Sequence, residues 1–300
     1  MRQLLRRLWG LYRRLHLLAA RRKPDGPFVP HWRASWTDDV AANRVLSLAA
    51  RPLRLWAAVR RHRSRFSVVI VNWNSRAFLA DTLRAVRRFS PPGTEILVVD
   101  NGSRDGSRRF LRRQRDVRRI LLPWNLGHAP ALDLGFLLAR GEYVASLDVD
   151  ALPLSSGWLD QLATPLERGE ATVSGVAAFR GYIHPCCLLM QRTHFLQKRH
   201  TFVGRFEKGP GLGSEFWDTG ESISIREGRE NLAPVERTHV RGPYALGVTF
   251  GSVVFHNGCS TRGPDPSMPD LTTETVLESW REAVQRTLAP APAPGSEGLT

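Results

Sequence analysis

FSVVIVNW (66–73) is a continuous apolar run, rich in β-branched residues, that ends in a polar tip. Such a run is typical of a strand buried on both faces of a parallel sheet. A helical pattern over 75–89 follows it, with Ser75 as a candidate N-cap. Strand texture returns at 94–103, 117–123 and 142–150, separated by helical patterns at 105–115 and 128–140. This alternation predicts an open α/β sheet with right-handed crossovers.

Each predicted strand ends in polar residues. Ligands of open α/β sheets bind beyond the carboxyl ends of the strands, so we expect these side chains to gather at one edge. The tips are Asn72 and Asn74; Asp100, Asn101 and Gly102; Asn125 and Gly127; and Asp148 and Asp150.

The residue types at these tips suit a nucleotide and a cation. Asp148 and Asp150 flank one residue, and two carboxylates on one side of a strand favour a hard divalent ion. Asp100 can accept hydrogen bonds from a base or a ribose hydroxyl. The plain alternatives are an accidental acidic pair, a turn at Asn101 and Gly102, and a helix cap at Asp100. The glycine loops typical of ATPases and dinucleotide-binding enzymes do not occur in the sequence.

Three stretches together carry a family resemblance: VVIVNWNS (68–75), LVVDNGSRDGS (97–107) and WNLGHAPALDLGFLLARGEYVASLDVDA (124–151). They resemble the family 2 glycosyltransferases of the GT-A fold, most of all the rhamnosyltransferase-like branch. The resemblance covers roughly residues 66–262 and is strongest over 66–160. It implies a mostly parallel sheet flanked by helices that binds a nucleotide-diphosphate sugar with Mn²⁺ or Mg²⁺. Asp133, where asparagine is common, and the nearby His128 and Pro130 depart from the family pattern.

The resemblance also implies roles for single residues. Asp148 and Asp150 would be the D-x-D pair that holds the metal, and Asp100 would meet the base. The nucleotide-sugar pocket would be lined by Asn72, Asn74, Asp100, Asn101, Gly102, Asn125, Gly127 and Asp148.

The acceptor side of the predicted site lies further along the chain. EFWDTGESIS (215–224) stands where the family carries an acidic motif, and an inverting transfer needs a base to deprotonate the acceptor hydroxyl. Asp218 is the first candidate and Glu221 the second; the alternative is that Asp218 only caps a helix. The resemblance implies that His256, in the predicted late strand 248–262, is a third metal ligand; the alternative is an ordinary strand-end histidine. His184 is a weaker acceptor-side candidate, and the glycine-rich stretch 207–215 is a candidate lid.

The positive charge is concentrated at the N-terminus. Residues 1–65 hold 16 of the 43 Lys and Arg against three acidic residues, so they carry +13 of the net +15. Leucines at spacings of three and four in residues 1–22 predict a basic amphipathic helix. It would contact an anionic membrane, or else dock on its own catalytic domain or pair with a second copy of the chain. We therefore predict a basic helical extension (1–64), a GT-A domain (65–263) and a partly disordered tail (264–300).

These observations predict a metal-dependent inverting glycosyltransferase. It would transfer a sugar from a nucleotide-sugar to a lipid-linked or polysaccharide acceptor at the cytoplasmic face of the membrane. The three cysteines indicate a reduced compartment, and no nucleic-acid-binding motif is recognisable. The alternatives are the same fold acting on a protein, peptide or nucleic acid, and a catalytically silent scaffold with this fold.

Overall fold

The protein is described here from a computed structural model. The structure describes residues 54, 57, 61–178, 180–203, 218–240, 246–258 and 272–289. The predicted helix at 1–22, the predicted lid at 207–215 and the final residues of the predicted tail lie outside this part of the chain.

The first part of the described chain alternates strands and helices, as the sequence predicts. Its elements are β1 (Ser64–Asn72), α5 (Arg76–Phe89), β2 (Glu95–Asp100), α6 (Ser107–Arg113), β3 (Val117–Leu121), α7 (His128–Leu138) and β4 (Gly141–Asp148).

The second part has shorter strands. Its elements are β5 (Ala151–Pro153), α8 (Trp158–Glu167), β6 (Val173–Ala177), β7 (Ile183–Gln191), α9 (Arg192–Gln197), α10 (Glu221–Glu227), the 3-10 helix η1 (Arg229–Asn231), β8 (Leu232–Val235), β9 (Arg237–Val240), β10 (Val248–Phe250), β11 (Val254–His256) and α11 (Thr273–Leu288).

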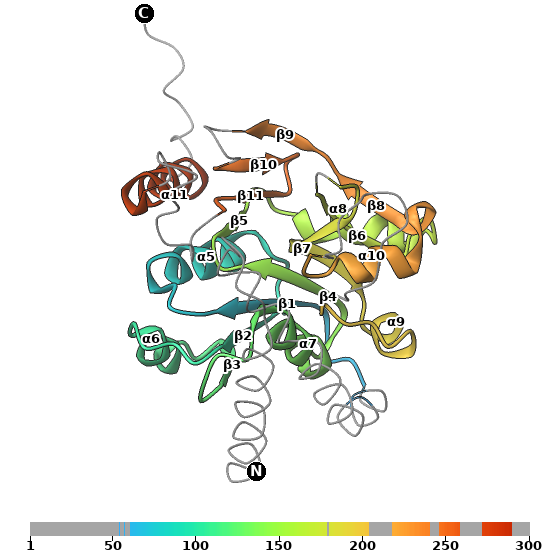
Figure 1. Ribbon diagram of the computed structural model, residues 1–300, viewed down its shortest axis with the longest axis horizontal. Coiled ribbons are helices and arrows are strands. Elements are labelled where there is room, and N and C mark those ends of the chain that lie inside the picture. Colours follow the sequence, from blue (N-terminus) through green and yellow to red (C-terminus); the bar gives the residue numbers. More distant parts are fainter. Residues whose placement is uncertain are drawn as a thin grey trace, which may run out of the picture.

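The strands form two sheets (Figure 1). The larger has seven strands in the order β3-β2-β1-β4-β7-β6-β8, and the smaller has four in the order β5-β11-β10-β9. Strands β3, β2, β1 and β4 run parallel, whereas β7 is antiparallel to both of its neighbours. The predicted fold class, a mostly parallel sheet flanked by helices as in the GT-A fold, is confirmed.

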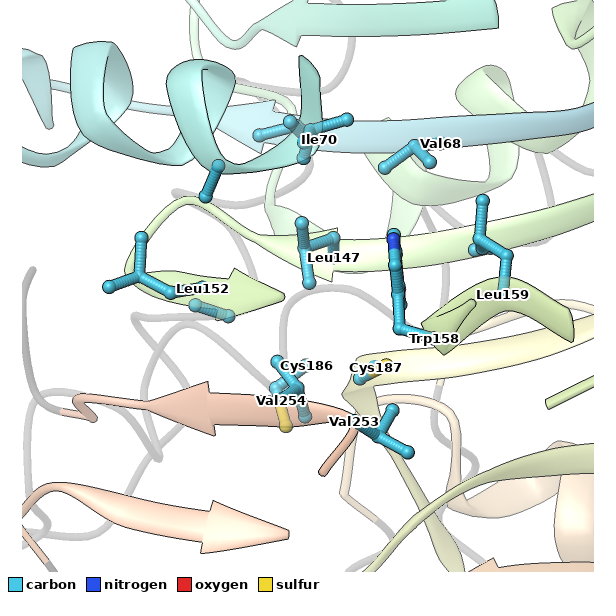
Figure 2. Close-up of a cluster of buried hydrophobic side chains, with 14 of the residues drawn as sticks. Val68, Ile70, Leu147, Leu152, Trp158, Leu159, Cys186, Cys187, Val253 and Val254 are labelled. Atoms are coloured by element: carbon cyan, nitrogen blue, oxygen red, sulfur yellow. The ribbon is translucent and has the colours of Figure 1, made fainter. Parts of the chain in front are cut away.

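Apolar residues cover both faces of the large sheet. On one face, α5 and α8 pack in a cluster that extends to the small sheet; on the other, side chains of α7 and α9 form a second cluster. Figure 2 shows the centre of the first cluster, where β1, β4 and α8 meet Cys186 and Cys187 of β7. Both thiols are buried and form no disulfide, and Cys187 is the one that fits the expected role of a small apolar residue, because Cys186 also interacts with His184 and His256.

Two local expectations need correction. The predicted late strand is a hairpin of β10 and β11, which turns at 251–253. Ser75 occupies the N-cap position of α5 but makes no capping bond with its side chain. Instead, the Asp105 carboxylate accepts a hydrogen bond from the backbone N–H of Arg76 at 2.7 Å, because the two loops lie side by side.

Helix α11 packs on the domain although it lies beyond the predicted boundary at 263. The rings of Trp280 and Phe78 of α5 are 5.2 Å apart, and the Trp280 indole N–H donates to Asp81 at 3.3 Å. The predicted boundary itself stays a prediction.

Gly135 allows α7 to approach β1 closely. A Cβ atom at this position would lie 2.3 Å from Cγ1 of the fully buried Val69. The close packing of α7 on the central strand β1 therefore requires glycine at position 135.

We predict that Gly135→Ala lowers the free energy of unfolding by about 1–3 kcal/mol through overpacking. Because the clash is with Val69, the Val69→Ala background should reduce that penalty. Denaturant titration of the four proteins in this double-mutant cycle measures the coupling. Purely additive effects would contradict the proposed contact.

Candidate active site

Strand register brings three of the predicted polar tips together. Asn72 of β1 lies opposite Asp100 of β2, and Val71, one residue earlier, lies opposite Asp148 of β4. The Asn72 amide donates to the Asp100 carboxylate at 2.9 Å. The predicted meeting of these strand ends at one edge of the sheet is therefore confirmed.

The nucleotide-side candidates organise two loops. The Asn101 side chain donates to Oδ1 of Asn125 at 2.7 Å and to the carbonyl of Gly127 at 3.0 Å. Its own Oδ1 accepts the backbone N–H of Leu126 at 2.8 Å. Asn101 thus holds the loop at 125–127 against the end of β2.

Gly102 and Asn74 have left-handed backbone conformations, with φ of 81° and 50°. A Cβ atom on Gly102 would lie 2.5 Å from the backbone carbon of Trp124, so the loops can meet only at a glycine. Asn74 accepts the backbone N–H of Arg104 at 2.8 Å. Both residues shape the rim of the site.

Asp100 is fully buried, and its two oxygens have partners in the protein. One faces the Asn72 amide, and the other accepts the backbone N–H of Ser103 at 3.2 Å. Its predicted contact with a base stays a prediction. The observed bonds give Asp100 a clear role in joining β1 to the loop after β2.

Asp148, Asp150 and His256 form one group, with a ligand atom from each within 4.8 Å of the others. The His256 Nε2 lies 3.5 Å from Asp148 Oδ2 and 3.6 Å from Asp150 Oδ1. Asp148 ends β4, but Asp150 lies in the turn after it, so a turn and not a regular strand brings the carboxylates together. His256 reaches them because β11 pairs with β5, where it lies opposite Ala151.

A second histidine faces this group from α7. The His128 Nε2 lies 3.5 Å from Asp148 Oδ1. Burial disfavours the charged form of Asp148, but His128 and His256 outweigh it and hold the pKa of this carboxyl well below its usual value. Burial also opposes protonation of His256, but the neighbouring Cys186 and both aspartates raise its pKa well above its usual value.

The group fits a divalent cation. Two carboxylates and an imidazole offer oxygen and nitrogen donors, a set that suits Mn²⁺ better than Mg²⁺, which prefers oxygen. The gaps of 3.5 and 3.6 Å are longer than ordinary hydrogen bonds. A metal would replace the positive charge that His256 supplies between the two aspartates.

A second group with metal-type donors consists of His194, His200 and Glu227. Hydrogen bonds account for it: Glu227 lies 3.0 Å from the His194 Nε2 and 2.5 Å from the His200 Nε2. The Thr172 hydroxyl also donates to this carboxylate, at 2.6 Å. The Nδ1 atom of His200 is buried and has no partner in the described structure, whereas metal-bound histidines almost always use this second nitrogen.

The two candidate bases differ in what surrounds them. Glu221 accepts the Arg180 guanidinium and the backbone N–H of Asp218, each at 2.6 Å. Asp218 accepts the Tyr182 hydroxyl at 2.7 Å and is only half-buried. Helix α10 begins at Glu221 with Gly220 as its N-cap, so Asp218 is not the cap that the alternative reading required. The Glu221 carboxylate is therefore held in an ion pair with Arg180, whereas the Asp218 carboxylate forms no ion pair with a described residue and is more available to a ligand.

Side chains connect this acceptor side to the Asp148 group. The Tyr182 ring lies 6.1 Å from the His184 ring, and His184 lies 5.9 Å from His256. With the bond from Tyr182 to Asp218, a continuous row of contacts joins Asp218 to the aspartates. The sequence indicated His184 for this side but not Tyr182, although Tyr182 directly precedes the buried strand β7 and His184 is its second residue.

Part of the sequence matches known proteins. Residues 67–213 match the model described as glycosyl transferase family 2. The undecaprenyl-phosphate 4-deoxy-4-formamido-L-arabinose transferase of Pseudomonas paraeruginosa is 39% identical over 92 residues, 28% of this chain and 27% of that protein. The poly-beta-1,6-N-acetyl-D-glucosamine synthase of Staphylococcus epidermidis is 30% identical over 89 residues, 29% of this chain and 22% of that protein. The chain thus spans about a quarter of the length of these curated relatives.

Among solved structures, the mannosyltransferase PcManGT of Pyrobaculum calidifontis, in complex with GDP-Man and Mn²⁺, aligns with 85% of this chain and 86% of its own. The sequence identity is 16% and the TM-score is 0.45. Within the described residues, no helix combines the length and apolar character needed to cross a membrane.

We predict that Mn²⁺ together with a nucleoside diphosphate raises the melting temperature of the full chain. Asp150→Asn should remove most of this shift, because binding to the native state stabilises only as far as the ligand is held. His194→Gln, in the second histidine group, is the matched control and should keep the shift. Loss of the shift in the control alone would move the metal to that group.

Proposed function

We propose that this chain is a metal-dependent inverting glycosyltransferase, because residues 67–213 match the model described as glycosyl transferase family 2. Its donor would be a nucleotide-diphosphate sugar, and its acceptor a lipid-linked or polysaccharide chain. The observation that carries the proposal is the group of Asp148, Asp150 and His256 at the edge where β1, β2 and β4 end.

The donor would lie along this edge, with its diphosphate beside the aspartates. Bound there, Mn²⁺ or Mg²⁺ would neutralise the negative charge that develops on the leaving diphosphate. Asp148, Asp150 and His256 would hold the ion, and Asn101 would keep the 125–127 loop in place beside the nucleotide.

Trp73 offers a surface for the base. It stands between Asn72 and Asn74, and the residue is 41% exposed, which is rare for a large apolar residue in the described chain. Stacking on an exposed aromatic ring suits any base, because every base has a π face.

We expect Trp73→Ala to weaken nucleotide-sugar binding on the order of 10-fold, the lower end of a stacking contribution of about 1–3 kcal/mol. Trp73→Phe keeps a ring and should retain most of the affinity. Isothermal titration with the donor measures both variants, and equal affinity of Trp73→Ala and wild type would exclude stacking.

Asp218 would act as the base toward the acceptor hydroxyl. Asp218 is half-buried, and the Tyr182 hydroxyl donates a hydrogen bond that orients one of its carboxylate oxygens. Through Tyr182 and His184 it is connected to the group of Asp148, Asp150 and His256. Burial raises the pKa of Glu221, although the Asp218 backbone N–H and Arg180 act in the opposite direction. Because Glu221 forms an ion pair with Arg180, we assign it a structural role.

Asp218→Asn should therefore lower turnover by about 10²–10⁴-fold with little change in donor affinity. Glu221→Gln should mainly lower the melting temperature, because it weakens the pair with Arg180. Steady-state kinetics and thermal melting separate these effects. A folded Glu221→Gln enzyme without turnover, beside an active Asp218→Asn enzyme, would reverse the assignment.

The membrane side of the proposal concerns the acceptor. A relative whose name includes undecaprenyl-phosphate, a lipid phosphate, matches this chain over 92 residues. The +13 charge of residues 1–65 also suits an anionic surface. We therefore place the proposed reaction at the cytoplasmic face of the membrane, with residues 1–22 as a peripheral contact.

A further inference from the structure

An unusual concentration of arginine covers α6 and the edge strand β3. Residues 104–119 contain eight arginines and only two acidic residues, Asp105 and Asp116. Arg108 and Arg118 turn inward, toward Asp100 and Glu95. The remaining six are exposed and form what we call the arginine patch: Arg104, Arg109, Arg112, Arg113, Arg115 and Arg119.

The charges of the arginine patch are not neutralised by the described protein. None of its six guanidinium groups makes an ion pair with another described residue. The nearby Asp116 forms its ion pair with Arg87, with 2.6 Å between the Arg87 Nε and the Asp116 Oδ2. Residues 66–300 carry only about +2 in all, so the patch is a local excess and not an average property of the domain. Like charges this dense repel one another and favour an anionic partner.

The patch occupies one flank of the molecule. β3 is an edge strand of the large sheet, and α6 lies beside it (Figure 1). Arg104 belongs to the loop at the rim of the site, where its backbone N–H meets Asn74. Arg119 also protects the strand edge from pairing with another sheet, but that task does not explain the arginines of α6.

From these observations we propose that the arginine patch docks the domain on an anionic lipid surface. The carboxyl ends of β1, β2 and β4, which carry the site, would then lie beside the head groups. Arginine side chains bind phosphate groups through paired hydrogen bonds. The choice of a membrane as the partner depends on the proposed lipid-linked acceptor. The excess positive charge of the patch is an observation that does not depend on that proposal.

The composition of the patch argues against a single-stranded nucleic acid. Proteins that bind single strands combine basic residues with exposed aromatic rings, on which bases stack. Phe110 is the aromatic residue within 104–119; it is half-buried, and the Arg76 guanidinium lies over its ring at 3.9 Å from the centroid. The patch is therefore electrostatic in character and suits a surface of phosphate head groups.

The test is co-sedimentation of the full chain with vesicles of two parts phosphatidylcholine to one part phosphatidylglycerol. Changing Arg109, Arg112 and Arg113 together to Gln should lower the partition coefficient on the order of 100-fold, because each basic residue near an anionic surface contributes about a factor of five. The same three positions changed to Lys keep the charge and should retain binding.

A scattered control carries the same change in net charge. Arg168→Gln, Arg237→Gln and Arg281→Gln alter three exposed arginines outside the patch. This variant should bind vesicles nearly as well as wild type, since screening confines the interaction to about 10 Å. Melting temperature and nucleotide-sugar turnover on a soluble acceptor, measured for every variant, report on folding and on the proposed function independently.

Three results would overturn the proposal. Equal loss of vesicle binding in the patch and scattered variants would assign binding to net charge alone. Unchanged binding of the patch variant would show that the flank does not face the bilayer. Loss of duplex or single-stranded DNA binding in the patch variant, with vesicle binding intact, would assign the surface to a nucleic acid.

Discussion

The parallel pairing of β2, β1 and β4 is the constraint on which the site depends. Their register brings Asn72, Asp100 and Asp148 to the same end of the strands, although Asn72 and Asp148 lie 76 residues apart in the chain. Residues without side chains maintain this arrangement: Gly135 lets α7 pack on β1, and Gly102 lets two rim loops touch. The site is therefore a property of strand register and close packing before any single side chain acts.

Charge balance then explains how the edge can hold anionic ligands. Asp148 and Asp150 lie beside His256, and His128 approaches the second carboxylate oxygen of Asp148. Two histidines can support the buried carboxylates when no cation is bound, and a divalent ion would supply a stronger and more compact charge. A row of rings, Tyr182 and His184, extends from His256 to Asp218, so the proposed donor and acceptor sides share one set of contacts.

Much of this arrangement was predictable from the sequence because buried parallel strands leave a strong pattern. Apolar runs that end in polar tips predicted the sheet, and the family resemblance added His256. Distant side chains were harder: the short strands β5 and β11 that bring His256 to Asp150 give no clear periodicity. The Arg180–Glu221 pair was also hidden, since 41 residues separate its partners and no local spacing indicates it.

The most direct test of the account is a crystal structure of the protein with Mn²⁺ and a nucleoside diphosphate, with anomalous scattering recorded at the manganese edge. The account predicts one manganese peak within bonding distance of Asp150 and His256, and the nucleotide along the carboxyl ends of β1 and β2. A peak between His194, His200 and Glu227, or a nucleotide bound away from this edge, would contradict it.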